Sequence, residues 1–364
     1  MREPNTFSDP TFSAAVINWQ QVHGRHALPW QNTTDAYRIW LSEIMLQQTQ
    51  VAAVLGYYAR FLDRFPDVLT LAAAPAEDVM AHWAGLGYYT RARNLHACAQ
   101  RVAHEYDGVF PGDPALLADL PGIGRSTAAA IAAFSGGFRA AIMDGNVKRV
   151  FARVFGIDQY PGEKRVEEAL WRRADALLPE TGIEAYTQGL MDLGATLCTR
   201  SRPACERCPL QDRCIAYATG RTDELPIRKP KKTVPEKHTQ MLVILDAGQV
   251  VLHQRVASGI WGGLVSLPEV DGHLPMLDLA PADAAMTRAA SAFGQVDDMQ
   301  ALLPLVHVFT HYKLHIQPFR VGLEQRRDLP DGYAWYDMDR IEQAALPSPV
   351  KKLLAQLAAP TLFS

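Results

Sequence analysis

Four of the five cysteines stand close together near the middle of the chain: Cys198, Cys205, Cys208 and Cys214. In a reducing compartment, thiols spaced C-x6-C-x2-C-x5-C are poor candidates for structural disulfides and good candidates for metal ligands. The single C-x2-C pair departs from the two pairs of a usual zinc ribbon, and the run also departs from the bacterial ferredoxin pattern. The spacing predicts a four-cysteine metal site and leaves zinc and an iron–sulfur cluster both open. Cys98 lies in an apolar helical pattern and is interpreted as a buried thiol.

Two closely spaced glycines form a second feature with binding potential. The segment LPGIGRSTAAAI (120–131) places Gly122 and Gly124 in a tight turn ahead of a helix rich in small residues. Backbone N–H groups at a helix start attract phosphate, so the segment predicts a phosphate contact. The residues alone leave open whether that phosphate belongs to a nucleotide or to a nucleic acid backbone.

The elements that must position these residues fall into three stretches. Apolar residues recur at three-and-four spacing through most of the first 220 residues, which predicts helices separated by short breaks. The charged, proline-rich segment 221–238 is typical of an exposed linker. Beyond it we expect a β-hairpin with an Ala-Gly turn, further strands and a closing helix, from QMLVILDAGQVVLHQR (240–255), PLVHVFTHYKLHIQPFRVGL (304–323) and LPSPVKKLLAQL (346–357).

Charge is unevenly distributed along the 364 residues, a length that suggests two or three domains. The formal net charge is −3, yet residues 198–232 carry nine basic against four acidic side chains. Arg200, Arg202 and Arg207 lie between the cysteines, where a positive patch suits a polyanion. No apolar run reaches membrane-spanning length and the N-terminal residues lack a secretory pattern, so we expect a cytoplasmic, nucleoid-associated protein with no membrane partner.

Eight short motifs together carry a family resemblance: LPW (28–30), SEIMLQQTQV (42–51), GLGYYTRARNLH (85–96), LPGIGRSTAAAI (120–131), MDGNVKRV (143–150), MDLGATLCTRSRPAC (191–205), GIWGGLVSLPE (259–269) and FTH (309–311). With these motifs the chain resembles the MutY family of bacterial adenine DNA glycosylases, in the helix–hairpin–helix superfamily. The resemblance covers nearly the whole chain. It implies an all-α helix–hairpin–helix glycosylase with an iron–sulfur cluster domain, followed by a C-terminal α+β MutT/Nudix-like domain.

The same resemblance implies domain boundaries and a cofactor. Residues 1–29 and 138–220 would form the cluster domain, and residues 30–137 would form a six-helix barrel inserted into it. Residues 221–238 would be the linker and residues 239–364 the C-terminal domain. The four clustered cysteines would bind a 4Fe-4S cluster.

The chemistry implied by the family is hydrolysis of an N-glycosidic bond by two carboxyl groups. Glu43 would act as the acid that protonates adenine N7, and burial beside Ile44 and Leu46 would raise its pKa toward that role. Asp144 would be held ionised at a helix start and would stabilise the sugar cation, with or without a covalent bond. Asn146 would orient Asp144. Without the resemblance, Asp144 is better interpreted as an ordinary helix N-cap.

Reaching adenine in a duplex requires extruding it from the stack. By resemblance, Gln48 and Tyr88 fill and wedge the gap that the base leaves. The adenine pocket would be lined by Arg25, Trp30, Leu46, Gln188 and Met191. Gln188 carries both a donor and an acceptor, so it can pair with the hydrogen-bonding edge of adenine. Trp30 and Tyr88 would equally suit a hydrophobic core.

The resemblance implies that the glycine turn contacts a DNA phosphate through Gly122, Gly124 and Ser126. Arg200 and Arg202 would be further phosphate contacts. A nucleotide-binding G-x-G-x-x-G would follow a strand and carry a third glycine, whereas this turn follows a helical pattern. A monovalent cation would sit in the turn. Ser126 stands where endonuclease III-like relatives carry a lysine nucleophile, so we expect no efficient β-lyase activity.

The C-terminal domain retains only the opening of a Nudix box, in Gly263 and Glu269. LDLAPADAA (277–285) replaces the carboxylates that would hold magnesium, so nucleotide hydrolysis is not expected. By resemblance, Phe309, Thr310 and His311 form a hairpin tip that senses 8-oxoguanine. Relatives carry serine at the middle position, and threonine keeps the hydroxyl.

The sequence therefore predicts a monomeric, monofunctional glycosylase of base excision repair. Its substrate would be double-stranded DNA in which adenine is mispaired with 8-oxoguanine or guanine. A glycosylase for another mismatch such as thymine·guanine, and a non-catalytic DNA-binding iron–sulfur protein, are the alternatives. Gln188 and the C-terminal domain argue against the first, and the presence of both Glu43 and Asp144 argues against the second.

Overall fold

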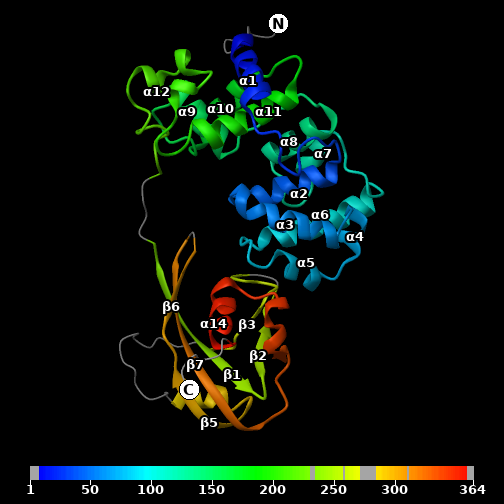
Figure 1. Ribbon diagram of the computed structural model, residues 1–364, viewed down its shortest axis with the longest axis vertical. Helices are drawn as coiled ribbons and strands as arrows, with labels where there is room; N and C mark the ends of the chain where they lie inside the picture. Colours follow the sequence, from blue (N-terminus) through cyan, green and yellow to red (C-terminus); the bar gives the residue numbers. More distant parts are fainter. Residues whose placement is uncertain (1–7, 230–233, 257–258, 271–283, 310, 359–364) are drawn as a thin grey trace. The chain divides into compact units, whose positions relative to one another are not determined.

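The chain divides into two compact units. The computed structural model describes residues 8–229, 234–256, 259–270, 284–309 and 311–358 (Figure 1). The first unit comprises residues 1–73 and 94–231, and the second comprises residues 74–93 and 232–364. Each unit has its own hydrophobic core.

The first unit is built from helices, as its periodicity predicts. Its helices are α1 (Pro10–His23), α2 (Ala36–Leu46), α3 (Val51–Arg64), α4 (Val68–Ala73), α6 (Thr90–Glu105, whose first turn falls in the second unit), α7 (Pro114–Asp119), α8 (Arg125–Gly136), α9 (Gly145–Val154), α10 (Lys164–Ala176), α11 (Ile183–Asp192) and α12 (Ile215–Ala218). A π-helical turn, η1 (Leu193–Leu197), extends α11, and the 3₁₀ turns η2 (Cys205–Arg207) and η3 (Gln211–Arg213) lie among the cysteines.

Aspartates fix where several of these helices begin. Asp9, Asp35, Asp113 and Asp144 are the N-cap residues of α1, α2, α7 and α9, and each side chain accepts hydrogen bonds from backbone N–H groups of the first turn. Such caps satisfy donors that have no partner within the helix. The cap of α2 therefore fixes the start of the helix that carries Glu43, and the cap of α9 is Asp144 itself.

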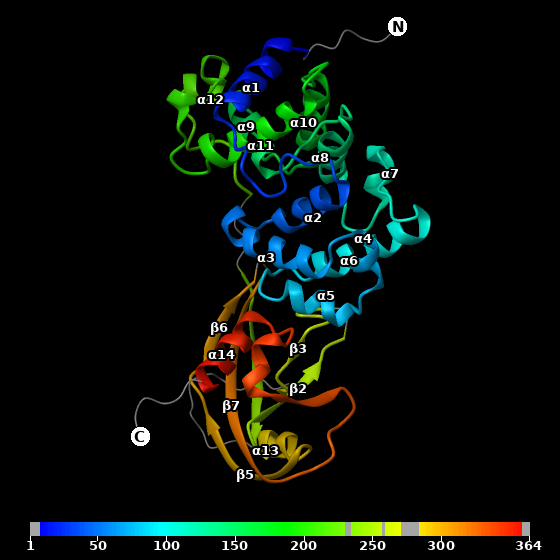
Figure 2. The same cartoon turned by 45° about the vertical axis from the view of Figure 1, so that its right-hand side comes forward.

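Close packing of α1 against α11 brings together two segments that are far apart in sequence (Figures 1 and 2). Gly189 permits the approach, since a Cβ there would lie 2.7 Å from the Val16 side chain. Phe12, Phe151 and Tyr186 fill the core below, with Phe12 packed edge-on against the other two rings. The contact carries the loop after α1 along the side of α11, where the candidate site lies.

The second unit joins α5 (Ala76–Trp83) to a mixed eight-stranded sheet with helices α13 (Ala284–Ala290) and α14 (Ser348–Ala358) and a 3₁₀ turn, η4 (Met338–Gln343). The strand order is β3-β2-β1-β7-β5, with β4 on β1, β6 on β7 and β8 on β2. The strands are β1 (Glu236–Asp246), β2 (Gln249–Gln254), β3 (Val265–Ser266), β4 (Glu269–Val270), β5 (Gly294–Ala301), β6 (Leu305–Val308), β7 (Lys313–Arg326) and β8 (Tyr333–Asp337). Only the β1–β7 pair is parallel among the described strand pairs.

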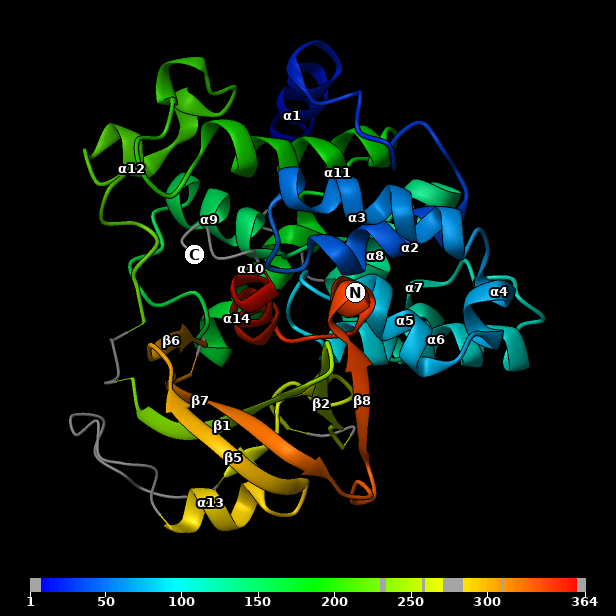
Figure 3. The same ribbon diagram turned by 60° about the horizontal axis from the view of Figure 1, so that its bottom comes forward.

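The predicted hairpin is confirmed as the β1–β2 pair. Its turn consists of Ala247 and Gly248, with φ values of +44° and +75°, which suits the twist of the flanking strands. Residues 240–244 of β1 are buried on both faces, which is typical of a strand covered on two sides. Figure 3 shows α13 and α14 on opposite sides of this part of the sheet. The helix predicted at 346–357 is confirmed as α14.

No helix in the described ranges combines the length and apolar character needed to cross a membrane.

Candidate functional site

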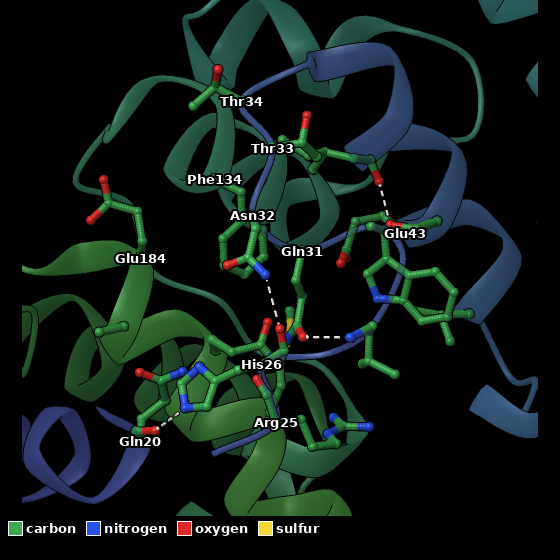
Figure 4. A pocket seen from close by; sticks show the side chains of 18 of the residues that line it. Gln20, Arg25, His26, Gln31, Asn32, Thr33, Thr34, Glu43, Phe134 and Glu184 are labelled. Atoms are coloured by element: carbon green, nitrogen blue, oxygen red, sulfur yellow. Dashed lines mark hydrogen bonds between the residues drawn. The ribbon is translucent and has the colours of Figure 1, made fainter. Parts of the chain in front are cut away.

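The first unit contains a cavity of about 800 Å³ between α2, α11 and the loop that follows α1. Figure 4 shows Glu43 on α2 and Glu184 on α11 approaching it from opposite sides. Six residues singled out from the sequence line this one cavity: Arg25, Trp30, Glu43, Leu46, Gln188 and Met191. They come from three separate segments, so the fold alone brings them together. Trp30 is at the same time largely buried and packs edge-on against Tyr58.

Glu43 is the acid candidate. Its carboxyl lies deep in the cavity wall, although the residue keeps some accessible surface because it faces the hollow. Burial, followed by the negative charge of Asp144, raises the pKa of the Glu43 carboxyl to about 8. A carboxyl with that pKa is protonated at neutral pH and can donate a proton. The burial effect predicted from its apolar neighbours is confirmed.

Asp144 caps α9 and has a different environment. Its carboxylate accepts hydrogen bonds from the backbone N–H groups of Asn146 and Val147, at 2.9 and 2.8 Å, and from Asn146 Nδ2 at 3.2 Å. These bonds favour the ionised form, as predicted from the helix start. Burial nevertheless raises the pKa of Asp144 and outweighs these bonds, an effect that the helix start alone does not indicate. Desolvation inside the protein is the reason, and a sequence pattern does not measure it.

Two arginines that the sequence analysis did not single out connect α9 to the cysteine segment. Arg149 donates to Asn146 Oδ1 at 2.8 Å and to the carbonyl oxygens of Gly194 and Cys198 at 2.6 and 2.7 Å. Arg153 is almost fully buried and places Nη1 3.3 Å from Cys198 Sγ. The two arginines stand four residues apart, on one face of α9, and this spacing is the signal by which the sequence could have indicated them. Their partners lie about 45 residues away in sequence, so the spacing does not reveal the contacts.

The four clustered cysteines line one small cavity beside α9 and η1. Burial is the first cause that raises the pKa values of Cys205, Cys208 and Cys214, and negative charge on the neighbouring thiols raises them as well. In the described ranges, no three His, Cys, Asp or Glu side chains surround a point that a single metal ion could occupy. Four cysteine thiolates are the ligand set of a 4Fe-4S cluster, and all four thiols line this one cavity, so the cysteine set fits such a cluster. Bound iron would join the two ends of this segment.

Asp192, the last residue of α11, also went unnoticed in the sequence. Its fully buried carboxylate accepts from Gln188 Nε2 at 2.8 Å and forms an ion pair of 2.7 Å with Arg25. Two of the predicted pocket residues thus share one buried partner.

Gln48 and Tyr88, predicted to fill and wedge the stack, both lie on exposed loops with unusual backbone. Gln48 follows α2 with φ of +57°, and Tyr88, in the second unit, has φ of +50° and is 45% exposed. Left-handed backbone at a non-glycine residue is strained and recurs at functional loops. Tyr88 is therefore not a core aromatic, which was the alternative for it.

The glycine turn joins α7 to α8 and is exposed. Gly122 has φ of +79°, and a Cβ there would lie 2.9 Å from Asn94 Cβ. Gly124 is the N-cap of α8, and within the described residues no side chain caps this helix, so its first N–H groups are available. Ser126 Oγ accepts from the Met143 N–H at 2.9 Å, which ties the start of α8 to the residue before Asp144. Arg200, Arg202 and Arg207 are exposed.

In the second unit, Phe309 belongs to an aromatic cluster after β6. Its ring stacks on Tyr312 at 4.7 Å and lies 5.6 Å from Trp261, while His311 is exposed. Thr310 and most of the segment 277–285 lie outside the described residues. Of the Nudix-box remnants, Glu269 is paired with Arg255 at 2.6 Å, and Gly263 has φ of +79°.

Comparisons with known proteins match three segments of the chain. Residues 41–176 match the HhH-GPD superfamily base excision DNA repair proteins, residues 198–214 match the iron-sulfur binding domain of endonuclease III, and residues 240–356 match the NUDIX domain. The adenine DNA glycosylase of Buchnera aphidicola subsp. Schizaphis graminum (strain Sg) is 34% identical over 94% of this chain and 97% of its own length. The adenine DNA glycosylase of Mus musculus is 31% identical over 94% of this chain and 77% of its own.

The chain belongs to the adenine DNA glycosylase family.

Membership in this family makes the chain a DNA glycosylase of base excision repair. The predicted helix–hairpin–helix fold with an iron–sulfur motif and a C-terminal Nudix domain is confirmed. The iron–sulfur match spans all four clustered cysteines and indicates the 4Fe-4S cluster of this family.

Two solved structures resemble the glycosylase part of the family fold. A thermostable thymine-DNA glycosylase is 30% identical, with a TM-score of 0.53 over 57% of this chain and 96% of that one. An endonuclease III–DNA complex, 21% identical with a TM-score of 0.50 over 58% of this chain and 95% of that one, shares the fold.

Proposed function

We propose that this chain is a monofunctional glycosylase that removes adenine mispaired with 8-oxoguanine or with guanine. The observation that carries the proposal is the buried Glu43 carboxyl in the cavity wall, close enough to Asp144 to feel its charge, in a family member whose relatives are named adenine DNA glycosylases. One carboxyl with a raised pKa and one held by N–H donors are what N-glycosidic bond cleavage needs.

In the proposed reaction, the duplex is held by the glycine turn and by Arg200 and Arg202, with a monovalent cation in the turn. Gln48 and Tyr88 fill the gap left by the extruded adenine. Glu43 gives its proton to adenine N7 as the bond to the sugar lengthens. Asp144, oriented by Asn146, stabilises the cationic sugar until water completes the hydrolysis.

We further propose that the chain lacks efficient β-lyase activity. Ser126 offers a hydroxyl that already accepts from Met143 N, and a hydroxyl cannot form the Schiff base that precedes strand cleavage. Lys148, on α9, is held by Glu167 at 2.5 Å. Borohydride should therefore trap little protein on DNA. Trapping as efficient as that of a lysine-bearing endonuclease III would contradict this part of the proposal.

A thymine·guanine glycosylase is the second candidate, favoured by the likeness to the thymine-DNA glycosylase structure. That likeness covers the glycosylase part alone, whereas the adenine glycosylase relatives match 94% of this chain, including the Nudix domain. The pairing capacity of Gln188 also suits adenine.

Single-turnover reactions on duplexes with one adenine·8-oxoguanine, adenine·guanine or thymine·guanine pair would separate the candidates. We expect adenine release from the first two, fastest opposite 8-oxoguanine, and strand breaks only after alkali treatment. Preferred release of thymine would favour the second candidate, and breaks without alkali would contradict the monofunctional assignment.

A further inference from the structure

We propose that Asp192 is a positioning residue for base recognition, because it fixes the orientation of both Gln188 and Arg25. The inference rests on the proposed function, since it concerns how the same cavity distinguishes adenine from other purines. Asp192 ends α11 and its side chain is fully buried. Its carboxylate accepts from the Arg25 backbone N at 2.8 Å, from Arg25 Nε and Nη2 at 2.7 Å each, and from Gln188 Nε2 at 2.8 Å.

The chemistry of a carboxylate determines which way the Gln188 amide faces. An ionised carboxylate only accepts hydrogen bonds, so the NH₂ end of the amide must point toward Asp192. The amide oxygen then points the other way, and no group of the described chain donates to it. Gln188 lines the cavity, so this oxygen is available as an acceptor for a base. The exocyclic amino group of adenine is a donor, whereas a 6-oxopurine presents a lone pair at the same position.

Arg25 is fixed by the same partner at both its backbone and its guanidinium. Gly24 adds a close approach, since a Cβ there would lie 2.5 Å from the Gln20 carbonyl oxygen and 3.1 Å from Asp192 Oδ2. The cavity-lining loop that starts at Arg25 is therefore anchored directly on α11. Asp192 therefore fixes the position of Arg25 on the loop relative to that of Gln188 on α11, and both residues line the cavity.

The test uses the full-length protein with its cluster and compares wild type with Asp192→Asn. An asparagine can donate as well as accept, so it no longer dictates the direction of the Gln188 amide. Single-turnover release of adenine and of hypoxanthine, each opposite 8-oxoguanine, gives the preference for the 6-amino base. We expect that preference to fall by about tenfold or more, from the loss of one enforced polar contact. Glu224→Gln, the same chemical change at an exposed ion pair with Arg221, should leave it unchanged.

A purely structural role would lower both release rates together and leave the preference intact, and that result would overturn the proposal. A second expectation is non-additivity: in a Gln188→Met background, Asp192→Asn should change the preference no further, because residues that act as one unit do not add. Should Asp192→Asn fail to fold, the pair Arg25→Met with Asp192→Asn removes both charges of this ion pair at once, so that neither is left without its partner. The preference of this double variant for adenine over hypoxanthine is then compared with that of Arg25→Met alone. Equal preferences in the two proteins would likewise overturn the proposal.

Wild-type protein separates the two levels of inference. Failure of the wild type to release adenine would contradict the proposed function. Adenine release by wild type, together with an unchanged preference in Asp192→Asn, would contradict only the positioning role of Asp192.

Discussion

The carboxyl groups of Glu43 and Asp144 are both buried, and they differ in the hydrogen bonds that they accept. Asp144 accepts two backbone N–H groups and the Asn146 amide, all of which stabilise a carboxylate. In the described part of the chain no group donates to the Glu43 carboxyl, and the charge of Asp144 further favours its protonated form. Of the two carboxyl groups, Glu43 therefore has the weaker support for a negative charge and is the better proton donor, and Asp144 has the better support for the charge.

The Asp144 carboxylate is open to a direct test, because asparagine is also a good N-cap. Asp144→Asn should keep α9 and the fold while losing the negative charge beside the sugar. We expect at least about a 100-fold lower single-turnover rate of adenine release, the scale of losing one electrostatic stabiliser. Mobility-shift assays should show retained binding of the mispaired duplex.

Asp113→Asn provides the matched control, since Asp113 caps α7 in the same manner. That variant should keep the wild-type rate of adenine release. Substantial residual turnover in Asp144→Asn would contradict the role assigned to its charge.

At the scale of elements, the exposed turn between α7 and α8 should position the duplex without reading its sequence. Gly122→Ala forces an alanine into a left-handed conformation and against Asn94 Cβ, so we expect the free energy of unfolding to fall by about 1 kcal/mol or more. Binding should weaken equally for matched and mispaired duplexes. Thermal unfolding and binding isotherms measure the two effects.

Gly124→Ala serves as the comparison, because its φ is −88° and a Cβ there has open space. Its stability should match wild type, while the added methyl stands where the turn would meet phosphate. A selective loss of binding to mispaired DNA in either variant would contradict a purely positional role for the turn.

Local patterns predicted some elements and missed others for physical reasons. Helices α2, α3, α6, α8 and α10 have apolar residues at helical spacing, the β1–β2 hairpin has a diagnostic turn, and all of these were predicted. Strand β5 was not, because its sequence GQVDDMQA carries few apolar residues and half of the strand is exposed. The contact between Arg25 and Asp192 spans 167 residues, and no local pattern reveals such a pair. Family motifs placed the pocket residues, but their mutual orientation required the fold.

At the scale of the whole molecule, the family fold combines a catalytic unit with a domain proposed to sense 8-oxoguanine. The aromatic cluster of Trp261, Phe309 and Tyr312 gives the tip a rigid base, and His311 is exposed beside it. Since these residues lie outside the catalytic cavity, their loss should change the choice of opposite base more than the chemistry.

Phe309→Ala combined with His311→Ala tests this division. We expect adenine release opposite 8-oxoguanine to slow by about tenfold, the scale of one lost aromatic stacking contact, and release opposite guanine to change little. Val306→Ala, an exposed position on β6, is the control and should change neither rate. Equal losses opposite both bases would argue against a sensing tip.

The dependence of the adenine release rate on pH tests the central claim most directly. Glu43 must be protonated to act as the acid, so the single-turnover rate should fall as pH rises through about 8, the raised pKa of its carboxyl. Glu43→Gln should be at least about 100-fold slower and should lack this falling limb, while Glu184→Gln, which changes another carboxyl of the same cavity, should keep both the rate and the limb. A wild-type rate that stays level or increases through pH 8, or full activity in Glu43→Gln, would contradict the account.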